Sequence, residues 1–198
     1  MQYPVMVKPR WGSASIGLSI AHNDDELVWA FNLARANVSR TFLTDLASDD
    51  SNGTVLIQEF IDGEEFGADV LNDFGGKHHC VYVKRKIGMR AGETDKATLV
   101  EDNRLTELAK RVGEISGHVG NLDMDLFATE SGRVLVLEMN PRFGGGYPFS
   151  HEFGARYPSA LLAWSQGDKF DVSSQRRIVD KVISKCDRLV VLGDQIIG

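Results

Sequence analysis

One stretch in the second half of the chain, residues 125–146, constrains the fold more than any other. It reads DLFATESGRVLVLEMNPRFGGG, and within it a Ser-Gly pair separates two apolar runs. A short turn signal between two such runs predicts a β-hairpin whose two-residue loop is Ser131-Gly132. In this register Glu130 lies opposite Arg133, and the two strands run outward from that pair.

The predicted hairpin gathers three oxygen-bearing side chains on one face. Asp125 falls opposite Glu138, and Asn140 lies two residues further along the same strand, so all three point the same way. Polar groups in an otherwise apolar sheet are costly unless they hold something, and hard oxygen ligands suit magnesium or manganese. The alternative is that the carboxylates pair with basic residues such as Arg142 or Arg90 and stabilise the fold.

Composition and charge exclude several classes of function. The chain has 198 residues, enough for one domain or two small lobes sharing a core, with the composition of a globular protein. A net charge of −6 argues against sequence-independent nucleic-acid binding, and no apolar run reaches membrane-spanning length. Cys80 and Cys186 lack metal-ligand spacing, and without a secretory signal they indicate a reduced, cytoplasmic setting.

The first strand and its loop are a candidate phosphate-binding feature. Residues 4–9 (PVMVKP) predict a buried strand with one charge, Lys8, and lysine is seldom buried without a partner. A loop of small residues with Ser13, Ala14 and Ser15 follows, and then a returning strand. The free N–H groups of such a tip can wrap phosphate oxygens, although an ordinary glycine-serine hairpin tip is the commoner case.

The end of the next strand is a second candidate binding feature. Residues 54–61 (TVLIQEFI) predict a strand that runs into an Asp-Gly turn, and residues 64–71 return. Free backbone groups and an apolar side chain at such a strand end can hold a flat heterocycle, and Glu65 can accept hydrogen bonds from sugar hydroxyls. A solvated acidic turn is the alternative. The strand-end residues are Gln58, Glu59, Phe60 and Ile61.

The remaining segments predict helices and strands that complete a mixed fold. A helix is expected from residue 23, where Asn-Asp-Asp-Glu supplies a cap, and a second, amphipathic helix over 102–118. A strand over 79–87 places Lys84 and Lys86 on one face, and residues 88–96 read as a loop. Further elements are expected as a flexible loop at 142–147, a helix at 155–165 and strands at 178–183 and 189–192.

Taken in order, these features resemble the ATP-grasp superfamily. They are Lys8-Pro9 before a small-residue hairpin, the segment QEFIDGEEF, and an aspartate separated by twelve residues from an E-x-N triplet. The segments GMRAGETDK and EMNPRFGGGYP are most similar to proteins related to the large chain of carbamoyl phosphate synthetase. The resemblance implies an α+β ATP-grasp fold whose two α+β lobes clasp a nucleotide: a small lid lobe at 1–75 and a larger lobe with an antiparallel sheet at 76–198.

The resemblance also implies how the nucleotide is held. Lys8 matches the lysine that reaches the ATP phosphates, and the small-residue loop matches the lid that closes on them. Gln58 occupies a position that is commonly a glutamate near the adenine amino group, and the three residues after it match the adenine hinge. Glu65 matches the carboxylate that binds the ribose.

The implied chemistry is ATP-dependent activation of a carboxylate. Asp125, Glu138 and Asn140 match ligands of Mg²⁺ or Mn²⁺, and Arg90 and Arg142 match positions that approach the transferred phosphoryl group or the acyl phosphate. The expected substrates are a small-molecule carboxylate and an amine-type nucleophile, with no nucleic acid and no membrane as partner. Positioning and electrostatics would supply most of the rate.

The chain departs from the family pattern at its start. It opens just before the PVMVKP strand, whereas the resemblance implies an N-terminal α/β domain ahead of that strand, with a basic residue for the α-phosphate; we expect both to be missing from this chain. We therefore expect self-association through an exposed strand edge at residues 3–9, or dependence on a partner domain or subunit. A nucleotide-binding or regulatory module without turnover is the alternative function, and Gln58 modestly favours it.

Overall fold

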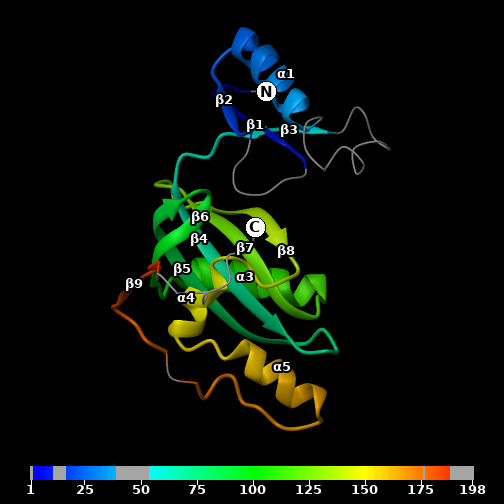
Figure 1. Cartoon of the computed structure of the whole chain (residues 1–198), viewed down its shortest axis with the longest axis vertical. Helices are drawn as coiled ribbons and strands as arrows, with labels where there is room; N and C mark the ends of the chain where they lie inside the picture. Colours follow the sequence, from blue (N-terminus) through cyan, green and yellow to red (C-terminus); the bar gives the residue numbers. More distant parts are fainter. Residues whose placement is uncertain (1, 11–16, 39–53, 176, 188–198) are drawn as a thin grey trace, which may run out of the picture. The chain divides into compact units, whose positions relative to one another are not determined.

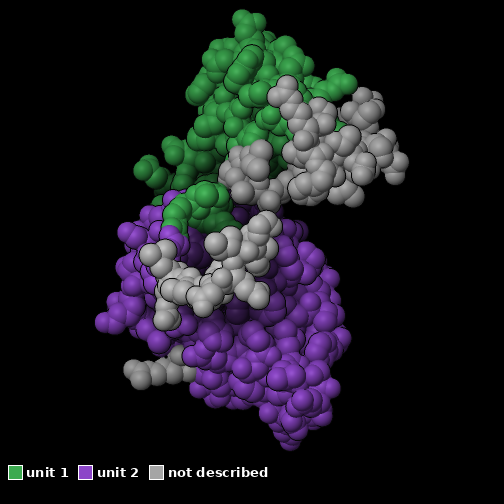
Figure 2. All heavy atoms as spheres, viewed as in Figure 1, with its two compact units in different colours: residues 1–65, 90–93, 127–135 green, residues 66–89, 94–126, 136–198 purple. Residues whose placement is uncertain are grey.

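The computed structural model divides the chain into two compact units, each with its own sheet (Figures 1 and 2). Each unit is an α+β structure, as the sequence predicts. None of the helices in the described part of the chain is long and apolar enough to cross a membrane. The structure describes residues 2–10, 17–38, 54–175 and 177–187.

Among its described residues, unit 1 contains a three-stranded antiparallel sheet covered by one helix. Strand β1 (Val5–Pro9) lies between β2 (Ser19–Ala21) and β3 (Val55–Glu59), and helix α1 (Asp24–Val38) packs on the sheet. The exposed edge expected at residues 3–9 is therefore a wrong prediction, because β1 is hydrogen-bonded on both sides. The unit comprises residues 1–65, 90–93 and 127–135.

The start of helix α1 follows directly from its sequence. The Asn23 side chain accepts a hydrogen bond from the Glu26 N–H (2.9 Å), and the Glu26 carboxylate accepts one from the His22 N–H (2.8 Å). This reciprocal arrangement satisfies N–H groups that have no partner within the helix. Ala30 and Ala34 then bury their small side chains in the unit's core.

Unit 2 is built on a six-stranded sheet in the order β8-β7-β4-β5-β6-β9 (Figure 1). The pairs β4/β5 and β6/β9 are antiparallel. The strands are β4 (Glu64–Asn72), β5 (His78–Arg90), β6 (Glu93–Leu99), β7 (Gly120–Ala128), β8 (Val134–Asn140) and β9 (Val182–Ser184). The unit comprises residues 66–89, 94–126 and 136–198.

In the described part of unit 2, this sheet is accompanied by the helices α3 (Asn103–Ser116), α4 (Tyr147–Glu152) and α5 (Tyr157–Ser165). Helix α3 buries Leu105, Ala109 and Gly113, and a Cβ at Gly113 would lie only 2.6 Å from Val70 Cγ1 of β4. Helices α4 and α5 contribute Phe149 and Tyr157, among others, to a separate apolar core.

Two expectations about local structure are wrong. The segment expected as a loop at 88–96 instead forms a tight turn between β5 and β6, because Ala91 and Gly92 both adopt positive φ, 51° and 79°. The loop expected to extend to residue 147 ends earlier, because helix α4 begins at Tyr147 with a proline in its first turn. The strand expected at 178–183 is observed only as β9, and the one at 189–192 lies outside the described residues.

Candidate active site

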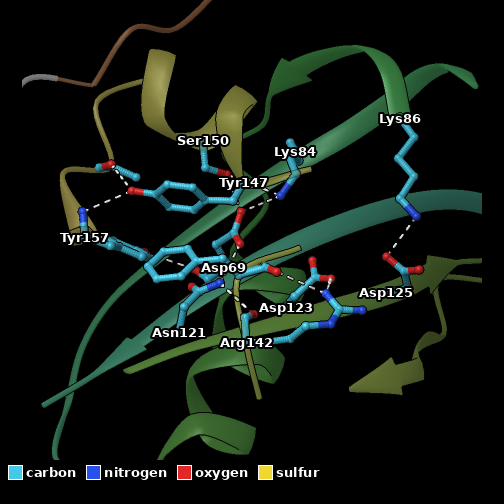
Figure 3. A network of polar contacts seen from close by, with 12 residues as sticks. Asp69, Lys84, Lys86, Asn121, Asp123, Asp125, Arg142, Tyr147, Ser150 and Tyr157 are labelled. Carbon is cyan, nitrogen blue, oxygen red and sulfur yellow. Dashed lines mark hydrogen bonds and ion pairs between the residues drawn. The ribbon is translucent and has the colours of Figure 1, made fainter. Parts of the chain in front are cut away.

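A stripe of polar side chains follows one face of strand β7. Asn121, Asp123 and Asp125 occupy alternate positions, so they point to the same side of the sheet (Figure 3). The residues between them, Leu122 and Met124, are buried on the other side. The strand therefore separates an apolar core face from a face that carries two carboxylates and an amide.

Arg142, in the loop after β8, pairs with the middle residue of this stripe. Its Nη1 lies 3.2 Å from Asp123 Oδ2, and 56% of its side chain remains exposed. A Cβ added at Gly144 would overlap the Asp123 carboxylate, so the loop rests directly on this residue. Burial raises the pKa of Asp123, and the nearby Asp69 and Asp125 carboxylates add to the rise while Arg142 opposes it.

A buried ion pair lies beneath the loop. Lys84 Nζ is 2.5 Å from Asp69 Oδ2, and the two side chains are 1% and 0% exposed. Ser150 Oγ donates to the same carboxylate oxygen (2.6 Å), and Asn121 Nδ2 donates to the other (3.0 Å). A buried charge is tolerated only when it is paired and hydrogen-bonded, and Asp69 meets both conditions (Figure 3).

Asp125, the outermost carboxylate of the stripe, also has a basic partner. Lys86 Nζ lies 2.8 Å from Asp125 Oδ1, with 8% of the lysine side chain and 30% of the aspartate side chain exposed. The basic partner considered for this carboxylate is thus found, but it is Lys86 rather than Arg142 or Arg90. Lys84 and Lys86 lie on one face of β5, as predicted, and each neutralises an aspartate.

The other two proposed metal ligands lie together on β8. Asn140 Nδ2 donates to Glu138 Oε1 (2.8 Å), which places both side chains on one face of the strand. Glu138 is exposed and Asn140 is half-buried. The pair is thus accessible to a ligand.

The hairpin that joins β7 to β8 exists, but its loop is one residue longer than predicted. The Thr129 N–H donates to the Arg133 carbonyl and the Gly132 N–H donates to the Thr129 carbonyl, both at 2.9 Å, and Gly132 adopts a positive φ of 85°. Three residues therefore form the loop. Continued along the strands without a bulge, this register places Leu137 opposite Asp125, so the two-residue loop no longer supports the facing of Asp125 and Glu138. Their convergence stays a prediction that rests on the resemblance.

The pair on β8 consists of oxygen donors of the kind that a hard divalent cation shared with phosphates takes. In the described ranges, no three His, Cys, Asp or Glu side chains gather into a ready-made metal cage. Magnesium usually takes only one or two carboxylates from a protein and completes its shell with water and substrate phosphates. Glu138 and Asn140 offer oxygen ligands of this kind, and Asp125 joins them only in the arrangement that the resemblance predicts.

In unit 1, two predicted nucleotide-binding residues share one sheet face. Lys8 pairs with Leu56 and Met6 pairs with Gln58, so Lys8 and Gln58 point away from the face that carries buried Val5. The half-buried state of Lys8 agrees with a lysine that lies on the face opposite the helix-covered core.

The other predicted residues of unit 1 lie at strand ends. Glu59 ends β3 and forms an exposed ion pair with Arg133 (3.4 Å), and the Phe60 N–H donates to the Pro4 carbonyl (3.4 Å). Ile61 follows, Glu65 is the second residue of β4, and Arg90 is the last residue of β5. The predicted phosphate loop with Ser13, Ala14 and Ser15 lies outside the described residues.

Sequence reasoning missed Asn121 and Asp123, although a signal was present. The segment Asn-Leu-Asp-Met-Asp-Leu alternates polar and apolar residues with the period of a half-buried strand. That alternation identifies all three members of the stripe, whereas the spacing to the E-x-N triplet identifies only Asp125. Asp69 lies in an apolar run with no comparable signal.

Comparison with known families gives a match over most of the chain. The model of a family described as the ATP-grasp domain matches residues 1–149. D-alanine–D-alanine ligase from Lacticaseibacillus casei is 28% identical over 151 residues, which are 70% of this chain and 38% of the relative. The same enzyme from Desulfotalea psychrophila is 34% identical over 152 residues, 69% and 43% of the two chains.

The chain is also similar to a synthase and to two solved structures. The carbamoyl phosphate synthase large chain of Halobacterium salinarum is 27% identical over 161 residues, 74% of this chain and 14% of the relative. This chain therefore spans less than half the length of each relative named. Among solved structures, Campylobacter jejuni biotin carboxylase superposes with a TM-score of 0.68 at 17% identity over 88% of this chain and 40% of that chain. L-amino acid ligase from Bacillus licheniformis gives 0.62 at 22% identity over 82% and 40%, and both likenesses show a shared fold.

Proposed function

The chain belongs to the ATP-grasp family, and from this premise we propose that it is a ligase that uses Mg-ATP to join a small carboxylic acid to an amine. In the proposed reaction, a carboxylate oxygen takes the γ-phosphoryl group of ATP, which gives ADP and an acyl phosphate. The amine then attacks the acyl carbon, the C–O bond to phosphate breaks, and an amide and inorganic phosphate leave. Named relatives are ligases of this kind, and because the chain spans less than half of each, their reaction is carried over here as a proposal.

The observation that carries this proposal is the juxtaposition of Arg142 with the carboxylates of β7. Arg142 is held by its ion pair with Asp123, yet more than half of its side chain is exposed, so part of the guanidinium remains accessible to a ligand. A planar guanidinium suits phosphoryl oxygens and stabilises charge that builds up on them during transfer. We assign Arg142 to the transferred phosphoryl group or the acyl phosphate, and Arg90 to the same charge by resemblance alone.

Asp125, Glu138 and Asn140 would hold the divalent cation. When bound, Mg²⁺ or Mn²⁺ supplies positive charge that offsets the phosphates and orients them. Lys86, whose side chain is 8% exposed, pairs with Asp125 in this structure, and a cation bound to Asp125 would replace that contact. The remaining nucleotide contacts are assigned to unit 1: Lys8 and the small-residue loop for the phosphates, the segment from Gln58 to Ile61 for adenine, and Glu65 for the ribose.

A Glu138→Gln variant tests the metal assignment. It preserves volume and removes one charge from an exposed side chain, so we expect the fold to survive and Mg-ATP to lose its stabilising effect. The measurement is the thermal shift of each protein with Mg-ATP, with ATP plus a chelator, and without ligand. Glu130→Gln is a matched control, because it makes the same change at an exposed position in the turn of the same hairpin. Equal protection of Glu138→Gln and the parent would show that Glu138 is not a ligand.

Phosphate release tests the ligase itself. We expect the parent to release inorganic phosphate from Mg-ATP only when a suitable carboxylate is present, and to form an amide when an amine is added. Panels of amino acids and small carboxylic acids are the first substrates to screen. Thermal protection by Mg-ATP without carboxylate-stimulated phosphate release across the panels would instead identify a nucleotide-binding module without turnover.

A further inference from the structure

Asn121, on strand β7, is hydrogen-bonded to the backbone of the loop that contains Arg142. Its Nδ2 donates to the Arg142 main-chain carbonyl at 3.2 Å and to Asp69 Oδ1 at 3.0 Å (Figure 3). Asn121 is only 3% exposed, so it cannot touch a substrate. It reaches the proposed chemistry only through the backbone of Arg142.

The amide group of Asn121 is suited to this bridging because both contacts use its N–H donors. Its Oδ1 is buried and has no hydrogen-bond partner among the residues that the structure describes. A buried carbonyl without a partner costs free energy. The two donated hydrogen bonds therefore account for the presence of an asparagine at this position.

Asp69, the other hydrogen-bond partner of Asn121, is itself held by several contacts. Asp69 accepts from Lys84 and Ser150 within the buried network, and Ser150 belongs to helix α4, which follows the loop directly. A Cβ at Gly146 would lie 2.9 Å from Lys84 Cε, so the end of the loop also rests on this network. The loop is thus fixed at its start by Asn121 and at its end by Lys84 and Ser150.

The loop between these anchors is held mainly by short-range hydrogen bonds, such as those from the Arg142 N–H to the Asn140 carbonyl (2.7 Å) and from the Tyr147 N–H to the Gly144 carbonyl (3.0 Å). Residues 144–146 are all glycine and have no side chains to pack. The Arg142 guanidinium donates to Asp123 and to the Phe143 carbonyl (both 3.2 Å), and the hydrogen bond from Asn121 to the Arg142 carbonyl is the contact that joins this backbone to the buried network. A backbone that moves by about 1 Å can lower a rate by about 100-fold when the shifted group acts on the reacting atoms.

We propose that Asn121 is a positioning residue for Arg142, coupling the proposed catalytic arginine to the buried Asp69–Lys84–Ser150 network. The kinetic part of this proposal rests on the proposed ligase function. The structural part, that Asn121 orders the loop, does not. The two parts are tested by separate measurements.

The test compares Asn121→Ala with Asn72→Ala. Asn72 is a fully buried asparagine on β4 whose Nδ2 also donates to main-chain carbonyls, those of Gly113 (2.9 Å) and Gly76 (3.1 Å). Both variants remove the same group from the same unit. We expect both to lower stability, but only Asn121→Ala to loosen residues 142–146. If Asn121→Ala does not fold, Asn121→Ser takes its place, because a hydroxyl is too short to bridge both partners.

The structural measurement is limited digestion with trypsin, which cleaves after Arg142. We expect cleavage at this bond, relative to the other sites, to be at least about tenfold faster in Asn121→Ala than in Asn72→Ala, because the carbonyl of the cleaved bond has lost its anchor. Equal relative rates in the two variants would overturn the proposal. This result is read without any activity assay.

The kinetic measurement is carboxylate-stimulated phosphate release. We expect Asn121→Ala to lower kcat by about 10- to 100-fold with little change in KM for ATP, and to have no further effect in an Arg142→Ala background. Additive losses in the double variant would show that Asn121 acts by another route. If the parent releases no phosphate, the proposed ligase function fails, while the digestion result still decides whether Asn121 orders the loop.

Discussion

Replacing Lys84 by methionine should destabilise the protein through the charge it leaves behind. Methionine keeps the length and apolar stem of lysine, so the change removes the ammonium with little loss of packing. Asp69 then keeps a carboxylate that is 0% exposed and has lost its counter-ion at 2.5 Å. Breaking a buried pair in this way costs about 3–5 kcal/mol.

The structure places the expected cost near the lower end of that range. Asp69 retains hydrogen bonds from Ser150 (2.6 Å) and Asn121 (3.0 Å), which still stabilise the carboxylate. We therefore expect a loss of about 3 kcal/mol, which for a chain of this length lowers Tm by about 6–12 °C. Adding Asp69→Asn should restore part of the loss, because no buried charge then remains unpaired.

Urea titration followed by circular dichroism measures this loss, and the chain provides a matched control. Lys86→Met makes the same change two residues along the same strand, where the partner Asp125 is 30% exposed and water replaces the lost contact. Its cost should be about 1 kcal/mol or less. If Lys84→Met costs no more than Lys86→Met, burial of the Asp69 charge does not govern the stability of this unit.

Two further predictions concern pH and helix packing. Burial lowers the pKa of His78 and of His118, so below about pH 6.5 the folded state binds fewer protons than the unfolded chain. Urea titrations should therefore show a free energy of unfolding that is constant above that pH and falls as the pH drops toward the lowered pKa values. Equal urea midpoints at pH 7.5 and pH 5.5 would contradict this. Gly113→Ala should destabilise by about 1–2 kcal/mol although alanine favours helix, because its Cβ would meet Val70 Cγ1 at 2.6 Å; an unchanged or raised Tm would show that α3 moves away from β4 at little cost.

Much of the fold could be predicted because its local signals agree with its packing. The capping residues before α1, the amphipathic period of α3 and the apolar runs of β1 and β3 all lie within single segments. The tight turn after β5 could not be predicted in this way, because Ala91 adopts a positive φ that alanine seldom takes. Its conformation depends on how the flanking strands pair, and the residues of the turn do not determine that pairing.

The hairpin loop shows how one residue changes a conclusion about a site. The sequence Thr-Glu-Ser-Gly is compatible with a two-residue or a three-residue loop, and the Thr129–Arg133 hydrogen bond selects the longer one. A shift of one residue moves side chains to the opposite face of a strand. The facing of Asp125 and Glu138 was therefore the part of the site most exposed to error, whereas the pairing of Glu138 with Asn140 depends only on the period of one strand.

The face of β7 divides its polar residues by depth. Asn121 is almost fully buried, and the side chains of Asp123 and Asp125 are 17% and 30% exposed. Desolvation of a charge costs less as exposure rises, so a polar group at the inner end of the stripe depends more on protein partners than a carboxylate at the outer end does. The inner residue is accordingly an uncharged amide bonded to the buried network, the middle one pairs with a half-exposed arginine, and the outer one carries the charge proposed for a cation. Sequence alternation alone assigns the same face to all three, and it is their depth that separates the positioning residue from the proposed metal ligand.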